Sequence, residues 1–244
     1  MGDKSSIEWT DATWNPTTGC SKVSPGCQNC YAERLSNRLR KMGNPKFIEG
    51  FKFTLHENAL TLPLKWKKPR KIFVNSMSDL FHEDMDNDFL RRCFKIMREA
   101  DWHIFQVLTK RPERMLKFIE NFGSVPDNVW LGTSVELKFF TYRIEILRKI
   151  NAKVKFISFE PLIGSLGKLD LNGISWVIVG GESGPKARTI KPEWVRDIRE
   201  QAKQQNVSFF FKQWGGKTPR SNGRILDGRL WDEFPKNVNL ETTF

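Results

Sequence analysis

Short runs of apolar and β-branched residues recur along the chain, and each run ends in polar residues or glycine. Runs of this length and composition predict buried strands of a parallel sheet. We place them at 71–78, 103–110, 128–136, 153–161, 175–183 and 207–215, and we expect a further strand near 13–20.

Between these runs, apolar residues recur with the spacing of amphipathic helices. The predicted helices span 29–42, 86–99, 112–121, 138–150 and 192–205. Strands that alternate with helices throughout predict a parallel sheet wound right-handedly. We therefore expect an α/β fold with a partial TIM-like (β/α) barrel of six to seven parallel strands. An open doubly wound sheet is the alternative.

The length of 244 residues suits one α/β barrel domain. We expect residues 1–214 to form the barrel and residues 215–244 to form a C-terminal extension that packs on it. Because the sequence has neither a long apolar run nor an export leader, we expect a soluble, cytoplasmic protein with no membrane partner. Composition does not fix the oligomeric state, and we expect a monomer.

Strand ends provide the list of candidate site residues, because ligands of parallel α/β folds bind at the carboxyl ends of the strands. Polar groups or glycines follow every predicted strand. As an alternative to ligand binding, any one of them can cap a strand or form a salt bridge with a neighbouring strand. The candidates are Ser78, Asp79, Lys110, Arg111, Ser134, Glu136, Glu160, Gly180, Gly181, Glu182, Lys212, Gln213 and Trp214.

Three cysteines, Cys20, Cys27 and Cys30, lie within one short segment with the spacing C-x6-C-x2-C. In a cytosolic protein this spacing favours metal binding over disulfides, and Cys93 lies apart from it in a predicted helix, where we expect a core position. The spacing alone leaves three possibilities open. These are a zinc site closed by His56, His82 or His103, a C-x-x-C redox site, and a 4Fe–4S cluster with one iron free of protein ligands.

The formal net charge is +12, from 40 lysines and arginines against 28 acidic residues. This balance favours a polyanionic partner such as nucleic acid, although an ordinary basic surface would look the same. The segment 65–71 carries four lysines and one arginine around Trp66 and could contact a nucleic-acid backbone. Nine tryptophans and nineteen phenylalanines supply core residues and, beside cations, flat faces for stacked bases.

Taken together, several segments resemble a three-Cys-motif radical-SAM-like family of phages and bacteria and, more distantly, spore photoproduct lyase. The resemblance covers residues 7 to 235 in order and implies a partial barrel that binds a 4Fe–4S cluster and S-adenosylmethionine. The segments are IEWTDATWNPTTGCSKVSPGCQNCYAER, KKPRKIFVNSMSDLFHE, WHIFQVLTKRPERM, VWLGTSVE, SFEPLIG, WVIVGGESGPKAR, FFFKQWGG and LDGRLWDEFP.

Two departures separate this chain from the wider radical-SAM pattern. The usual cysteine spacing is C-x3-C-x2-C with an aromatic residue before the last cysteine, whereas here the first gap is six residues and Asn29 occupies the aromatic position. The usual Gly-Gly-Glu after the second strand is also missing from that place, and Gly180-Gly181-Glu182 follows a late strand instead. We therefore do not transfer the role of the Gly-Gly-Glu motif.

The resemblance implies roles for the three cysteines, and charge complementarity with the implied S-adenosylmethionine suggests roles for the residues at the strand ends. Cys20, Cys27 and Cys30 would hold three irons of the cluster, and S-adenosylmethionine would chelate the fourth. Ser78 and Asp79 would accept hydrogen bonds from its ammonium group, Lys110 or Arg111 would pair with its carboxylate, and Ser134 with Glu136 would bind the ribose. Glu160 and Glu182 would serve the ribose, the sulfonium or the substrate, and Gly180 and Gly181 would allow close backbone approach. Candidate substrate contacts are Arg111, Lys212, Gln213, Trp214 and Arg229.

The leading functional hypothesis is therefore a radical S-adenosylmethionine enzyme that acts on nucleic acid by lesion repair or base modification. Such an enzyme needs an electron donor such as flavodoxin or ferredoxin. A peptide substrate is a variation of the same hypothesis. The competing hypothesis is a zinc-stabilised, non-catalytic nucleic-acid-binding protein.

Overall fold

The computed structural model describes residues 5–219 and 221–236. Seven parallel strands form one sheet in the order β1-β4-β5-β6-β7-β8-β9. Each strand begins close to the position that the apolar runs predict, although β1 and β4 end several residues earlier than expected. The strands are β1 (Ala12–Trp14), β4 (Lys71–Val74), β5 (Ile104–Thr109), β6 (Val129–Ser134), β7 (Lys155–Phe159), β8 (Trp176–Gly180) and β9 (Ser208–Gln213).

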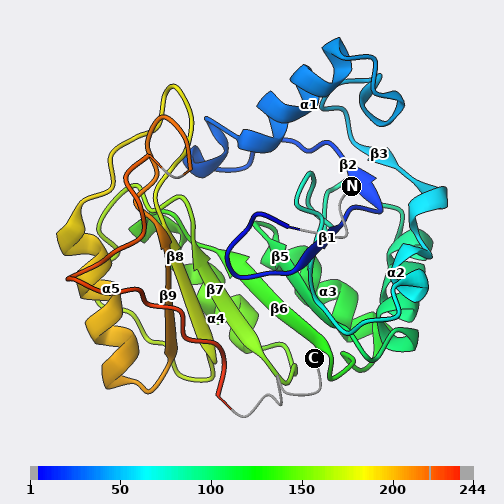
Figure 1. Cartoon of the computed structure of the whole chain (residues 1–244). Coiled ribbons are helices and arrows are strands. Elements are labelled where there is room, and N and C mark those ends of the chain that lie inside the picture. The colour runs from blue at the N-terminus through cyan, green and yellow to red at the C-terminus, as the bar shows by residue number, and fades with distance from the viewer. Residues whose placement is uncertain (1–4, 220, 237–244) are drawn as a thin grey trace.

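The strand order follows the chain order from one edge of the sheet to the other. A doubly wound sheet would reverse its order at a switch point, and this sheet has none. The sheet curves, with helices along its outer side, whereas the first helix of the chain (blue) lies apart from the sheet (Figure 1). The two edge strands β1 and β9 do not pair. The expected partial barrel of parallel strands is therefore confirmed.

All five predicted helical segments form helices. Two of them begin with proline at a first-turn position, where the missing N–H costs nothing. The segment 138–150 divides into a 3-10 turn at Lys138–Phe140 and a shorter α-helix. The helices are α1 (Tyr31–Lys41), α2 (Asn87–Glu99), α3 (Pro112–Phe122), α4 (Tyr142–Arg148) and α5 (Pro192–Gln204).

Two details of the expected alternation are wrong. The segment near 13–20 contributes β1 to the main sheet, but its second half, β2 (Thr17–Thr18), pairs antiparallel with β3 (Thr54–Leu55) in a separate sheet. The connection 160–175 between β7 and β8 forms no helix in the described structure. Its proline and three glycines interrupt any helical periodicity, so this crossover runs as a loop.

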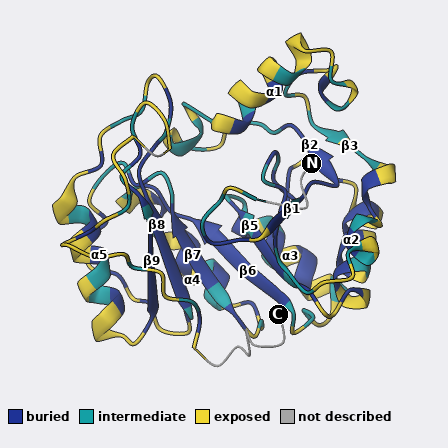
Figure 2. Cartoon of the chain, viewed as in Figure 1, coloured by how far each residue is buried: buried dark blue, intermediate teal, exposed yellow. Residues whose placement is uncertain are grey.

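The alternating faces of the strands build two separate apolar cores. On one face, residues such as Val107 and Val177 pack with the helices. On the other face, a cluster rich in aromatic rings forms the second core, and Trp176 within it is fully buried. The strands of the sheet are mostly buried (Figure 2). Gly132 makes room for this second core, because a Cβ there would lie 2.5 Å from the Phe156 ring. The tryptophans on the strands, Trp14, Trp130 and Trp176, are therefore all core residues.

The described part of the C-terminal extension packs against β9 and the aromatic core. Phe211 N donates a hydrogen bond to Trp231 O at 2.8 Å, and Phe234 stacks on Trp176 with ring centroids 5.2 Å apart. Residue 220 and residues 237–244 of the expected extension lie outside the described residues. A domain boundary at residue 214 stays a prediction. In the described part of the chain, every helix is too short or too polar to cross a membrane.

Candidate active site

The segment 19–30, here called the cysteine loop, begins at the carboxyl end of β4. Gly19 N donates to Met77 O at 3.0 Å, and Gly19 forms a parallel bridge with Ser78. The φ angle of Gly19 is +81°, and a Cβ at this position would lie 2.0 Å from Lys52 O. Only glycine allows the chain to turn here, so this residue sets the direction in which the loop leaves the sheet.

At the carboxyl end of β5, Asp79 and Arg111 join two strand ends to the cysteine loop. The Asp79 carboxylate accepts hydrogen bonds from Thr109 Oγ1 at 2.7 Å, Lys110 N at 3.1 Å and Arg111 Nη1 at 3.1 Å. Arg111 Nη2 then donates to Ser21 Oγ at 2.6 Å. Asp79 and Arg111 are both largely buried, so this ion pair is protected from solvent.

Cys20 lies beside the same ion pair. Arg111 Nη1 donates to Cys20 Sγ at 3.6 Å. Burial, followed by the negative charge of Asp79, raises the pKa of the Cys20 thiol to about 11, although Arg111 opposes both effects. Metal ions bind the thiolate form of cysteine, so metal binding at Cys20 would release the thiol proton. The nearby Arg111 guanidinium can stabilise the negative charge of the resulting thiolate.

At the end of β6, a fully buried carboxylate holds the middle of the cysteine loop. Glu136 Oε1 accepts a hydrogen bond from Gly26 N at 3.4 Å, and its Oε2 pairs with Arg143 Nη1 at 3.1 Å. The side chains of Glu136 and Arg143 are 0% and 2% exposed. Arg143 also donates to Ser134 O at 2.9 Å and lies 4.3 Å above the ring of Phe140. Each oxygen of the buried Glu136 carboxylate therefore has a partner, whereas the buried Arg143 Nε has no hydrogen-bond partner among the described residues.

At the end of β8, Glu182 holds the last part of the cysteine loop. Its carboxylate accepts hydrogen bonds from Asn29 Nδ2 at 3.0 Å and from Arg188 Nε at 2.9 Å. Arg188 Nη2 donates in turn to Pro25 O at 3.0 Å. Burial raises the pKa of Glu182, but the hydrogen bonds from Arg188 and Asn29 outweigh burial and lower this pKa. The hydrogen bond from Arg188 has the larger effect of the two. Glu182 is therefore an ionised, buried anchor for the loop.

The ends of β7 and β9 are joined by a separate ion pair. Glu160 Oε1 lies 3.0 Å from Lys212 Nζ, and Glu160 Oε2 accepts a hydrogen bond from Ser158 Oγ at 3.1 Å. The intervening strand end is Gly180, where a Cβ would lie 2.6 Å from Glu160 Oε1 and would force that carboxylate to move. Gly181 is constrained more strictly, because its Cβ would lie 2.0 Å from a backbone atom, Trp214 O.

All three thiols of the cysteine loop are free and partly exposed, as expected for groups that bind a ligand rather than each other. Cys93 is also free and is fully buried in α2, so the core position expected for it is confirmed. Among the described residues, no three or more His, Cys, Asp or Glu side chains lie close enough together to hold a metal ion. The structure therefore shows three donors on a common loop rather than an assembled metal site.

The three histidines lie in different places. His82 Nε2 accepts a hydrogen bond from Ser21 N at 3.1 Å, which places its ring next to Cys20. His56 Nε2 bonds Thr18 Oγ1 at 2.8 Å, just before the cysteine loop. His103 is buried immediately before β5, at the amino end of the sheet. Of the three candidate zinc ligands, His103 therefore lies at the amino ends of the strands, whereas the cysteines lie at the carboxyl ends.

Two other groups of sequence candidates lie away from the carboxyl edge. Arg229 stacks 3.5 Å over the Trp231 ring and lines a pocket with Val207 and Phe209, where β9 begins. The basic segment 65–71 ends where β4 begins, and Trp66 O accepts a hydrogen bond from Trp102 Nε1. The structure does not bring either group to the cysteine loop.

These contacts also use residues that were not candidate site residues in the sequence, among them Ser21, Asn29, Arg143 and Arg188. Asn29 could have been suspected, because it stands between Cys27 and Cys30. Arg143 and Arg188 carry no local signal. They are ordinary arginines in a helix and a loop until the fold places them beside Glu136 and Glu182.

Comparisons with known proteins give a family and a distant likeness. No curated protein matches the sequence significantly. A solved structure of spore photoproduct lyase complexed with dinucleoside spore photoproduct is similar with a TM-score of 0.45 and 12% identity, over 77% of this chain and 59% of that chain. A double mutant of that lyase with bound AdoMet and dinucleoside spore photoproduct has a TM-score of 0.46 and 12% identity, over 79% and 61%. This chain thus spans about three fifths of the length of the lyase. Residues 4–235 match the family model described as "Protein of unknown function (DUF5131)", and the chain belongs to that family.

Proposed function

We propose that this protein is a radical S-adenosylmethionine enzyme that acts on nucleic acid. One observation carries the proposal. Three free cysteines lie on a loop that is fastened across the carboxyl ends of β4, β5, β6 and β8 by Ser78, Arg111, Glu136 and Glu182. In a parallel α/β fold this edge is where ligands bind. Buried ion pairs at two of these anchors support a loop that must keep a defined position.

The donor set fits a 4Fe–4S cluster in kind and in number. Such clusters are held by cysteine thiolates, and three thiolates leave one iron open for another ligand. The thiolates of a cluster bind different irons, so they need not converge on one point as the ligands of a zinc ion do. Cys20, Cys27 and Cys30 would hold the cluster, and Arg111 beside Cys20 Sγ would stabilise one thiolate.

When bound, the cluster and S-adenosylmethionine supply one-electron cleavage of the sulfonium and hydrogen abstraction from the substrate. The protein's own groups would bind and orient. Within the described residues the Lys110 ammonium has no hydrogen-bond or ion-pair partner, so it is available for the methionine carboxylate. Ser78 remains our candidate for the ammonium and Ser134 for the ribose. Asp79, whose oxygens already accept several hydrogen bonds, would act mainly by positioning Arg111.

The nucleic-acid part of the proposal rests on charge. A net charge of +12 on 244 residues favours a polyanion, and it also suits an acidic electron donor such as flavodoxin. Lesion repair and base modification would both begin with hydrogen abstraction from the nucleic acid, and the proposal covers both reactions. The alternative substrate is a peptide, and the experiment below compares nucleic acids with peptides.

The proposal is tested by anaerobic reconstitution with iron and sulfide, followed by metal analysis and incubation with S-adenosylmethionine and dithionite. We expect bound iron and sulfide and reductant-dependent formation of 5′-deoxyadenosine. Adding single-stranded DNA, RNA or peptides then shows which class increases turnover. A protein that binds only zinc and forms no 5′-deoxyadenosine would contradict the proposal and favour the zinc-stabilised binding protein.

A further inference from the structure

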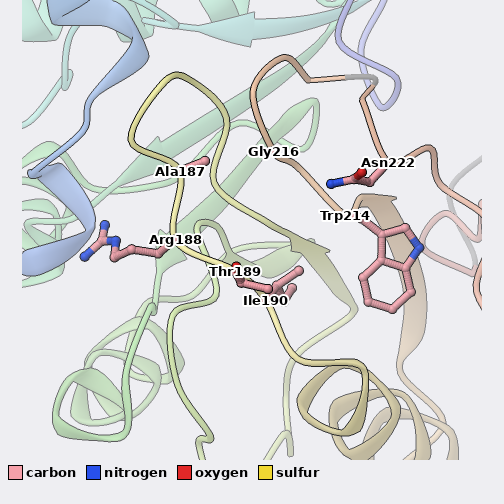
Figure 3. A pocket seen from close by; sticks show the side chains of 7 residues that line it. All are labelled: Ala187, Arg188, Thr189, Ile190, Trp214, Gly216 and Asn222. Atoms are coloured by element: carbon pink, nitrogen blue, oxygen red, sulfur yellow. The ribbon is translucent and has the colours of Figure 1, made fainter.

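A pocket of about 240 Å³ opens between the loops that follow β8 and β9 (Figure 3). One wall is the segment 187–190, and the other comes from the chain after β9. This pocket therefore lies at the same edge of the sheet as the cysteine loop. Its lining residues are Ala187, Arg188, Thr189, Ile190, Trp214, Gly216 and Asn222.

The indole of Trp214 forms a fixed, flat wall of this pocket. Its Nε1 donates to Ile225 O at 2.9 Å, and its ring meets the Phe211 ring edge to face with centroids 4.7 Å apart. These contacts hold the ring in place while it lines the cavity. An aromatic ring that is held at the wall of a cavity is suited to stacking with another flat ring.

The rim of the pocket is polar and cationic. Asn222 Nδ2 donates to Gly215 O at 3.0 Å, and in the described residues Asn222 Oδ1 has no hydrogen-bond partner. Lys186 and Lys217 are exposed and adjoin lining residues in the sequence. No carboxylate lines the pocket within the described part of the chain. This chemistry favours a flat group with hydrogen-bonding edges that is attached to an anion.

Arg188 connects the pocket to the cysteine loop. It lines the cavity, but its guanidinium points away from Trp214 (Figure 3) and pairs with Glu182. Glu182 in turn accepts the hydrogen bond from Asn29, the residue before Cys30. Arg188 Nη2 also donates directly to Pro25 O at 3.0 Å, so the pocket wall is joined to the cysteine loop both directly and through Glu182.

We propose that this pocket binds one unstacked base of single-stranded nucleic acid, with its ring against Trp214 and its edge near Asn222. The inference rests on the nucleic-acid part of the proposed function and names the subsite that would hold the substrate. The volume is below the ~300 Å³ at which pockets for drug-sized ligands begin, so it suits a single ring system rather than a stacked dinucleotide. The exposed lysines at the rim would face the phosphates.

The test measures fluorescence anisotropy of a short labelled oligothymidylate, and of an abasic oligonucleotide with the same phosphates and no bases. The protein is used without cluster or S-adenosylmethionine. We expect the base-bearing strand to bind about tenfold more tightly or better, because each stacked base contributes that much in other single-strand binding sites. Trp214→Leu and Ala187→Leu, which remove the flat wall and fill the cavity, should abolish this preference while both strands keep their weaker, salt-dependent binding.

Trp102→Leu is the matched control, because Trp102 is also partly exposed but precedes β5 at the other end of the sheet. This variant should keep the full preference, and thermal unfolding checks that all three variants fold. Equal binding of the two strands by the wild-type protein, or a preference that survives in both Trp214→Leu and Ala187→Leu, would overturn the inference. Neither result depends on 5′-deoxyadenosine formation, so failure of the proposed radical chemistry would be seen separately.

Discussion

The carboxylate of Glu182 accepts a hydrogen bond from Asn29 at 3.0 Å, although 153 positions separate the two residues in the chain. Glu136 makes the corresponding contact with Gly26, across 110 positions. Both glutamates follow strands of the parallel sheet, and both are buried. The cysteine loop is thus held by carboxylates that the sequence alone presents as potential ligand-binding groups.

Changing Glu182 to Gln should lower the free energy of unfolding by about 2 kcal/mol at neutral pH, because hydrogen bonds to an ionised, buried carboxylate are lost. The folded-state pKa of Glu182 lies below its ordinary value of 4.5. Its contribution is therefore complete above pH 4.5 and is lost as the pH falls through the lowered pKa. Denaturant unfolding of both proteins at neutral pH and at about pH 3 checks this.

The exposed Glu193 in the first turn of α5 is the matched control for that experiment. Glu193→Gln should leave stability nearly unchanged at both pH values. If the difference in free energy of unfolding between wild type and Glu182→Gln were the same at both pH values, Glu182 would not act as an ionised anchor.

Changing Glu136 to Gln should be more damaging, about 3–5 kcal/mol, because it leaves the Arg143 guanidinium buried without a countercharge. The double variant Glu136→Gln/Arg143→Met removes the stranded charge and should recover much of this loss. Chemical denaturation of the two variants measures the difference. If the single and double variants were equally destabilised, the loss would come from packing and not from the buried charge.

Adding a methyl group at Gly180 tests the Glu160–Lys212 pair. In Gly180→Ala the new Cβ would lie 2.6 Å from Glu160 Oε1 and force the carboxylate away from Lys212. We expect a loss of about 1–3 kcal/mol, as for other overpacked sites. In the double variant Gly180→Ala/Glu160→Ala, the shortened side chain at position 160 removes the clash. The unfolding midpoint of the double variant should therefore be close to that of Glu160→Ala alone. Failure to do so would point to strain in the strand itself.

Iron content can distinguish a cysteine that binds the cluster from a cysteine of the core. Cys30→Ala should lose most of the iron after reconstitution, while the apoprotein unfolds at nearly the wild-type temperature, because Cys30 is partly exposed on the loop. Cys93→Ala should behave in the opposite way. Its side chain is fully buried, so the variant should unfold at a lower temperature and keep its iron. Iron analysis and thermal unfolding of both variants provide the comparison, and equal iron in the two would exclude Cys30 as a ligand.

Local pattern predicted most of the secondary structure. The apolar period placed a helix at 86–99, and α2 spans Asn87–Glu99. It placed a strand at 103–110, and β5 spans Ile104–Thr109. It was wrong near 13–20, where β2 leaves the main sheet to pair with β3. A strand of two residues has too few side chains to show a period, so only its partner identifies it.

The sequence by itself determined the parallel α/β class, the position of the strand ends, and the presence of three thiols on one short segment. These depend on residue types and spacings within short windows. Tertiary structure alone decided what the strand-end carboxylates contact. Glu136, Glu160 and Glu182 all follow strands, and each pairs with an arginine or lysine. Arg143 and Arg188 follow their glutamates by 7 and 6 positions. Lys212, the partner of Glu160, lies on β9. A carboxylate at a strand end looks the same in sequence whether it faces a ligand or a neighbouring cation, because the partner is chosen by strand order and loop path.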